Sequence, residues 1–529
     1  MMKMDNLFKP YNQNQLMLLP PSLEELIPEG HLARVVNQVI EELDLSELIE
    51  TYKGGGASAY HPVMMLKVLI WGYLDGIRTS RRLAKALREN VVYMWLAGGQ
   101  KPDFRTIANF RSGRLRGCIK RIFKRVVEIA NMLGLVDFSR LFVDGSKFEA
   151  NGNRHKMVWR KRIEMEKEKL ERKIEEILEE AERLEEEENR RYGDKDLPEV
   201  GEGRCIKDED VQRVIKEETE KENEKIRARK KKALERKLRE LKERKMRYEG
   251  WEERLRGRKG CSRTDPDASC MRMKDDVLKP AYNVLLGTEN QVIVNYEVEQ
   301  NASDGSCFIN LMDGIKDLYG RVVEKVSGDA AFGNEENYAY CEKNGIEAYL
   351  KYPTYHAEKT RKFKEDVFRK ENWEYDERRD VYVCPRGEEL EFCEEAEEVT
   401  ATGYRKKVKI YRCKGCNECP HKGICTKGES RSVSRNERNE RFKATARQLL
   451  NSPIGEKLRK ERGSDVEATF GDIKNNLFFR RFLLRGKLKV EVEMGLIAIA
   501  HNIKKIREKI REFKDWICGN GGRLVHAIA

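Results

Sequence analysis

The chain has 529 residues, of which 39% are hydrophobic and 37% charged, and 105 Lys and Arg against 92 Asp and Glu give a formal net charge of +13. This length allows three or four domains, and the charge permits nucleic-acid binding without demonstrating it. Mean hydropathy is −0.75 and no apolar run reaches the roughly 18 residues of a membrane helix, so we expect no membrane span. The N-terminal sequence lacks the apolar stretch of a signal peptide, and we therefore expect a cytoplasmic protein.

The N-terminal region, residues 1–138, is predicted to be an all-α domain. Apolar residues recur at helical spacing over 61–76, and a second, cation-bearing helix is expected over 80–90 after a glycine-containing turn. A helix, a tight turn and a basic helix are the parts of a helix-turn-helix, which favours Arg81 and Arg82 as DNA contacts. A plain helical bundle is the alternative interpretation.

Residues 156–258 are predicted to form an inserted antiparallel coiled coil. Ile163, Leu170 and Ile177 repeat at coiled-coil spacing, and a second long charged helix follows a polar break. The first helix is acidic and the second is basic. Solvated helix surface explains this sorting, although the basic half could also lie along a phosphate backbone.

Strand-like runs flank this insertion and predict a split α/β domain. Apolar β-rich segments occur in 139–155 and 259–353, with helices between the later ones, and two helices in 451–513 complete the pattern. We therefore expect one split α/β core assembled from these three stretches. A cysteine-containing insertion occupies 354–450.

Three carboxylates are candidates for metal-dependent chemistry. Asp144 and Asp329 each follow an apolar β-run and precede a small residue, and Glu467 lies on a helix expected near the C-terminal end. Acids at strand ends of an α/β sheet face a ligand, and three of them could hold two divalent cations about 3.5–4 Å apart across a phosphodiester. Asp329 is preferred as the second acid because it ends a strand. The alternatives for this position are Asp265, Asp267 and Asp304.

A cysteine cluster suggests a zinc site. Two Cys-x2-Cys steps with a distant partner suit tetrahedral Zn²⁺, which would stabilise a segment too polar to fold alone. The preferred ligands are Cys384, Cys416, Cys419 and Cys425. Cys413 could replace one of them, an iron–sulfur cluster is an alternative, and unligated thiols are another.

Several segments resemble the DDE transposases of bacterial insertion sequences. The stretches that carry the catalytic resemblance are LFVDGSKFEAN, SGDAAFGNEEN and DVEATFGDIKNNLFFRRFLLRG. The N-terminal stretches LPPSLEELIPEGHLARVVNQ and YHPVMMLKVLIWGYLDG resemble the helical N-terminal domain of the same enzymes. The closing LIAIAHNIKK matches as well, so the resemblance covers nearly the whole chain in colinear order.

The spacing around Glu467 is similar to that of the Tyr-Arg-Glu-Lys subgroup. Lys474 follows the glutamate with six residues between them, as in the signature. Arg462 stands one residue farther from the glutamate than the signature arginine, and no tyrosine stands three residues before it. Arg462 and Lys474 are expected to bind DNA. Further basic residues could bind phosphates with them, and a basic helix surface is the alternative interpretation; these residues are Arg480, Arg481 and Arg485.

The resemblance implies an RNase H-like mixed-sheet core and a transposase that cleaves and joins DNA. It implies two Mg²⁺ or Mn²⁺ ions held by Asp144, Asp329 and Glu467. The implied partners are the terminal inverted repeats of an element and its target DNA, bound by a homodimer or larger assembly in the bacterial or archaeal cytoplasm. The alternatives are a catalytically inactive, transposase-derived DNA-binding protein and a structure-selective DNA nuclease.

Overall fold

The computed structural model of the chain describes residues 22–52, 58–192 and 208–519. These residues pack into two compact units, one formed by 1–149 with 282–529 and the other by 150–281. The first unit contains the N-terminal helices, the central sheet and the cysteine-containing segment together. The division into four domains made from the sequence therefore stays a prediction.

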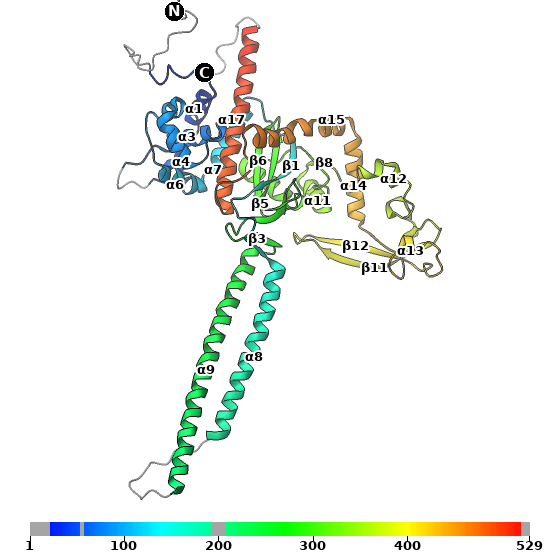
Figure 1. Cartoon of the computed structure of the whole chain (residues 1–529). Helices are drawn as coiled ribbons and strands as arrows, with labels where there is room; N and C mark the ends of the chain where they lie inside the picture. Colours follow the sequence, from blue (N-terminus) through cyan, green and yellow to red (C-terminus); the bar gives the residue numbers. More distant parts are fainter. Residues whose placement is uncertain (1–21, 53–57, 193–207, 520–529) are drawn as a thin grey trace, which may run out of the picture. The chain divides into compact units, whose positions relative to one another are not determined.

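The N-terminal part of the first unit is helical. Its elements are α1 (Leu32–Glu41), α2 (Ser46–Glu50), α3 (Pro62–Leu74), α4 (Ser80–Glu89), α5 (Val91–Leu96), α6 (Phe104–Ser112), η1 (Arg114–Gly117) and α7 (Ile119–Met132). α3 is buried on nearly every side, because it packs against α1, α5 and the long C-terminal helix α17 (Lys487–Gly519) (Figure 1). The turn before α4 contains Gly76 at φ +78°, and the Thr79 hydroxyl caps α4 by accepting the Arg82 amide.

A mixed sheet forms the centre of the first unit. Its strands are β1 (Arg140–Glu149), β5 (Leu278–Glu289, from Tyr282 onward), β6 (Val292–Glu299), β7 (Lys325–Gly328) and β8 (Glu347–Leu350). They lie in the order β6-β5-β1-β7-β8, with β1 parallel to β7, β7 parallel to β8, and β5 antiparallel to β6. This α/β arrangement is compatible with the RNase H-like core expected from the resemblance.

Helices cover the sheet and lead to its C-terminal segment. They are η2 (Gly305–Cys307), α10 (Phe308–Tyr319), α11 (Glu335–Asn344), α14 (Glu437–Asn451), α15 (Pro453–Arg462), the π-helical turn η5 (Gly463–Glu467), α16 (Ala468–Gly471) and a second π-helical turn η6 (Asp472–Asn476). α17 follows, and it packs against β6, α7 and α3. One helix thus connects the sheet with the N-terminal helices.

A second, smaller sheet contains the cysteine cluster. Its strands are β9 (Glu374–Asp376), β10 (Val381–Val383), β11 (Glu389–Val399), β12 (Arg405–Cys413) and β13 (Ser432–Arg435), with short helices η3 (Ala357–Lys359), α12 (Arg361–Lys364), η4 (Lys370–Asn372) and α13 (Lys422–Cys425) nearby in the chain. The order is β13-β12-β11-β10-β9, and every adjacent pair is antiparallel.

The second unit holds two long helices on a small β base. It comprises β2 (Met157–Trp159), α8 (Arg160–Tyr192), α9 (Asp208–Leu255), β3 (Gly260–Ser262), β4 (Ser269–Arg272) and the first residues of β5. Ion pairs Lys167–Glu252 at 2.6 Å and Lys245–Glu171 at 2.9 Å show that α8 and α9 run antiparallel (Figure 1). Ile163, among the expected seam residues, is buried at the base of the pair, and a coiled coil stays a prediction.

Among the described residues, no helix is long and apolar enough to cross a membrane.

A carboxyl pair, buried Glu289 and exposed Asp137, joins the end of β5 to the segment before β1. The Glu289 side chain is 1% exposed. Its Oε2 atom accepts hydrogen bonds from the main-chain amides of Asp137 and Phe138 at 3.1 and 2.8 Å. The pKa of Glu289 is raised to about 8, first by burial and then by the neighbouring carboxyl of Asp137. The Glu289 carboxyl therefore binds a proton more tightly in the folded protein than in the unfolded chain.

We predict that Glu289 makes the fold less stable as pH rises. Its stabilising contribution is complete below its unfolded pKa near 4.5 and is lost progressively as pH approaches 8. We expect the wild-type free energy of unfolding to fall by on the order of 3 kcal/mol over this range, and Glu289→Gln should abolish this fall. The measurement is the melting temperature of both proteins between about pH 5 and pH 8. Curves that stay parallel across this range would contradict the prediction.

Candidate active site

The candidate acids gather at one edge of the central sheet. Asp144 lies within β1, just beyond the residues that pair with β7, and Asp329 is the first residue after β7. β1 and β7 are parallel, so both side chains emerge at the same edge. The sequence interpretation that Asp144 ends its strand was wrong, because β1 continues to Glu149 and there bridges to Arg481.

One guanidinium group lies among all three acids. The Arg462 Nη2 atom is 3.2 Å from the Asp144 Oδ1 and 4.0 Å from the Asp329 Oδ2, and its Nη1 is 3.0 Å from the Glu467 Oε1. The Arg462 side chain is 10% exposed, whereas that of Glu467 is 53% exposed. The structure therefore brings together acids that are 185 and 138 positions apart in the chain.

The surroundings raise the pKa of Asp144 to about 6. Burial is the largest cause, and the negative charges of Asp329 and Asp304 act in the same direction. The positive charge of Arg462 acts in the opposite direction. Asp144 is thus costly to ionise without a nearby cation.

A fourth carboxylate, that of Asp304, approaches the same cluster. The Asn283 amide donates to its Oδ1 at 2.5 Å, and burial raises the pKa of this carboxyl. A Cβ atom at Gly145 would lie 2.4 Å from the Asp304 Cγ, so only glycine permits this approach. Of the three alternatives for the second acid, Asp304 lies beside the cluster, whereas Asp265 and Asp267 belong to the second unit.

A π-helical turn explains the displaced arginine. Arg462 and Glu467 are five residues apart, a spacing that would turn their side chains apart on a regular α-helix. The turn between them, η5, is π-helical and accommodates one additional residue, so the two side chains meet. The π-helical turn therefore accommodates the one extra residue between Arg462 and Glu467 relative to the signature.

Buried contacts fix this turn to the β5–β6 hairpin. The Asp465 carboxylate accepts the Thr288 hydroxyl at 2.6 Å and the Gln291 amide at 3.0 Å. The Gln291 side-chain amide donates to the Ser464 carbonyl at 2.8 Å, and the main-chain carbonyl oxygen of Gln291 lies 2.8 Å from the Nε2 atom of His501. The position of Glu467 is therefore set from the sheet.

Side-chain contacts of Asp472 and Lys474 fix the second π-helical turn, η6. Burial acts to raise the pKa of Asp472, but hydrogen bonds from His501 and Lys504 hold it well below its usual range. Lys474, from the same turn, donates to the Ser146 hydroxyl at 2.5 Å and the Lys147 carbonyl at 3.0 Å. Lys474 thus lies against β1, two residues beyond Asp144.

The other basic residues predicted to bind DNA lie at the surface. Arg480 is exposed and donates to the Lys474 carbonyl and the Asn475 amide oxygen, and Arg481 pairs with Glu149 at 3.7 Å. The structure does not bring every one of them to the acids. Arg485 is exposed after this segment, and Arg81 and Arg82 are exposed on α4.

Sequence reasoning missed Lys351, which follows β8. Burial lowers the pKa of its ammonium group, Arg462 lowers it further, and Asp329 and Glu467 act in the opposite direction. These influences place Lys351 at the acid cluster. Its place after a strand parallel to β7 is the signal that could have identified it.

The thiols of the second sheet form one cluster. Cys413 and Cys416 are buried in its core, and Cys384 and Cys425 pack against them. The Arg431 amide donates to the Cys416 sulfur at 3.3 Å. Cys419 lies near enough to raise the pKa of Cys425, although burial is the larger cause. Both the preferred cysteines and the alternative Cys413 are therefore in this region.

The donor types fit the expected metals. Carboxylate oxygens are the ligands that Mg²⁺ prefers, and thiolates suit Zn²⁺. Within residues 22–52, 58–192 and 208–519, however, no group of three or more His, Cys, Asp or Glu side chains is arranged to hold a metal ion. At the acids, the guanidinium of Arg462 lies among the carboxylates that would have to converge on one.

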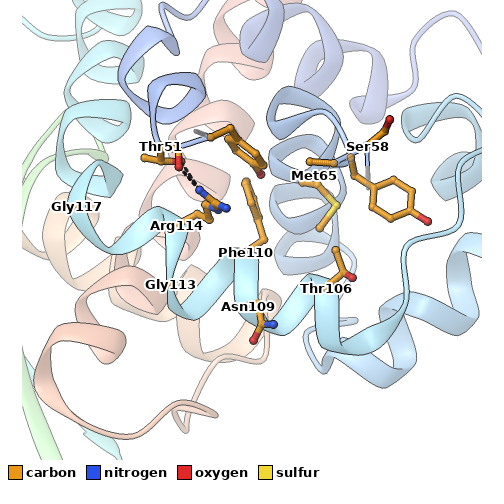
Figure 2. Close-up of a pocket in the computed structure, with 12 residues that line it drawn as sticks. Thr51, Ser58, Met65, Thr106, Asn109, Phe110, Gly113, Arg114 and Gly117 are labelled. Carbon is orange, nitrogen blue, oxygen red and sulfur yellow. Dashed lines mark hydrogen bonds between the residues drawn. The ribbon is translucent and has the colours of Figure 1, made fainter. Parts of the chain in front are cut away.

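A cavity of about 720 Å³ occurs among the N-terminal helices (Figure 2). Its lining includes Met65 of α3, Phe110 of α6 and the Arg114 guanidinium, which lies 4.1 Å from the centre of the Tyr52 ring. These residues come from the helical region, whereas the acids come from the sheet and the segment after α15. The cavity is therefore separate from the acid cluster.

Two family models match parts of the chain. Residues 383–507 match a transposase DDE domain, and residues 21–113 match a transposase domain (DUF772). No curated protein and no solved structure gives a significant match. The first match includes Arg462 and Glu467, and the second includes α3 and α4.

Together these matches support a DDE-type transposase. They indicate a transposase function and a nuclease or transposase enzyme. The bacterial insertion-sequence origin and the Tyr-Arg-Glu-Lys subgroup stay predictions.

We predict that Arg462→Gln destabilises the protein in the absence of divalent ions. The variant removes the guanidinium that lies among the three carboxylates, at an expected cost of about 1–3 kcal/mol. Addition of Mg²⁺ or Mn²⁺ should raise its melting temperature more than that of the wild type. The control is Lys457→Gln, which removes an exposed cation from the same helix. Equal responses to the ions in all three proteins would exclude this role for Arg462.

Proposed function

We propose that the protein is a DNA transposase that cleaves element ends and joins them to target DNA with Asp144, Asp329 and Glu467. The observation that supports this most directly is the convergence of these acids on Arg462. The transposase matches point to the same class of enzyme. In this proposal the acids hold two Mg²⁺ or Mn²⁺ ions. Bound there, the ions supply activation of the attacking oxygen and stabilisation of the leaving oxygen.

The chain's own residues position the DNA in this proposal. Asp144 and Asp329 are held at the sheet edge by β1 and β7, and the anchored turn η5 presents Glu467 to them. Arg462 and Lys351 bring positive charge to the cluster, where a phosphodiester carries negative charge. Catalysis would then come mainly from positioning and charge.

DNA ends would be recognised through the N-terminal helices. α4 follows α3 after a tight turn and presents Arg81 and Arg82 to solvent, as a recognition helix would. Two element ends must be brought together for transposition, so we propose at least a homodimer on DNA. The cytoplasm of a bacterium or archaeon is the proposed location.

We predict that Asp144→Asn abolishes cleavage of element-end DNA in Mg²⁺ and spares binding. The amide cannot supply the negative charge that a divalent ion needs, so the rate should fall by at least about a hundredfold. The measurement is cleavage and strand transfer on the DNA that flanks the coding region, with binding followed by fluorescence anisotropy. Glu456→Gln, which removes an exposed acid from α15, is the matched control.

The outcomes separate the proposed enzyme from its alternatives. Wild-type protein that binds the ends without nicking them would indicate an inactive DNA-binding protein. Cleavage without transfer of the 3′-hydroxyl to target DNA would indicate a structure-selective nuclease.

We further propose that the thiol cluster holds a structural Zn²⁺ ion. The gathering of Cys384, Cys416 and Cys425 supports this, together with the amide donated to the Cys416 sulfur. Purified protein should contain about one zinc ion per chain by mass spectrometry. Cys416→Ser should lower this content and the melting temperature, whereas Cys393→Ser, on the exposed face of β11, should change neither. Iron in place of zinc, or no metal at all, would refute this assignment.

A further inference from the structure

An exposed phenylalanine, Phe478, has an unfavourable backbone conformation. It lies just after η6 with φ at +51°, a region that residues with a side chain rarely adopt, and its exposed fraction is 73%. Phe138 also has a positive φ, but its ring is buried against Tyr319. The burial that compensates for Phe138 is missing at Phe478. Conformations of this kind are often kept at functional sites.

The backbone on both sides of Phe478 is held firmly. The preceding Leu477 is buried, and its main-chain amide donates a hydrogen bond to the Asp472 carbonyl. The following Phe479 is fully buried, and its main-chain amide donates to the Ile473 carbonyl. The Phe478 carbonyl accepts a hydrogen bond of 3.1 Å from Arg78. The chain is therefore fixed so that its aromatic ring is presented to solvent.

Basic residues flank Phe478 in the chain, and one of them contacts the strand that carries Asp144. Lys474, one turn earlier, is bonded to β1 two residues beyond Asp144. Arg480, two residues later, is exposed, and its guanidinium donates to two neutral acceptors. An exposed arginine two residues from an exposed aromatic ring suits DNA, because the cation binds phosphate and the ring stacks on a base.

We propose that Phe478 stacks on a DNA base next to the bond that the acid cluster cleaves. This inference rests on the proposed function and specifies how that site contacts its DNA. Phenylalanine wedges of this kind unstack neighbouring bases and bend the duplex. Arg480 would hold the adjoining phosphate.

The conformation of Phe478 provides a substitution that should not harm the fold. Glycine adopts positive φ readily, so Phe478→Gly should remove the ring and leave the melting temperature equal or higher. Phe478→Trp keeps an aromatic face. Phe392→Ala removes another exposed phenylalanine, on β11, and serves as the matched control.

The probe is a duplex of the DNA that flanks the coding region, with 2-aminopurine placed in turn at each position near its end. Binding is measured by anisotropy without divalent ions, and base stacking by 2-aminopurine fluorescence. For the wild type and Phe478→Trp, we expect a fluorescence change at one or two positions. Phe478→Gly should lose that change and bind about tenfold more weakly. Phe392→Ala should behave as the wild type.

Each other result overturns a stated part of the proposal. Tight binding by the wild type and Phe478→Gly alike, with the same fluorescence, would refute the role of Phe478 and leave the proposed function intact. A loss of self-association in Phe478→Gly, measured by sedimentation, with unchanged fluorescence would assign the ring to a protein contact. Wild-type protein that does not bind this DNA would refute both proposals.

Discussion

The attraction of one guanidinium for three carboxylates is the interaction on which the site depends. Arg462 is almost wholly buried, and burial also acts against the ionisation of Asp144. Neither charge would be tolerable alone at this depth, because removing an ion from water costs several kcal/mol. Their pairing makes the cluster stable in the absence of a metal ion. A divalent ion that enters must compete with, or displace, this arginine.

The same pairing constrains the backbone that supplies it. Arg462 and Glu467 meet only because η5 is π-helical, and such a turn is less favourable than a regular α-helix. The contacts of Asp465 with Thr288 and Gln291 offset that disadvantage from the adjacent hairpin. The β5–β6 turn therefore acts as a support for the third acid, although no residue of it touches the other two.

The sequence predicted the acids more readily than it predicted what holds them. Asp144 and Asp329 stood out because apolar strands precede them, and the α/β pattern around them gave a mixed sheet. The π-helical turn could not be foreseen, since it depends on a hydrogen bond between Asp465 and Gln291, 174 positions apart. The backbone of Phe478 likewise gives no local signal, because phenylalanine does not favour positive φ.

The order in which the chain is made has a consequence for the acid cluster. Asp144 and Arg462 are 318 positions apart, which corresponds to between about 15 and 60 s of synthesis on the ribosome. The continuous second unit is complete once residue 281 has been made, whereas the first unit includes α17, which is made last and packs against both its helices and its sheet. A nascent chain therefore carries its first aspartate without the arginine or glutamate that completes the cluster. The acid cluster can therefore assemble only when synthesis of the polypeptide is nearly complete.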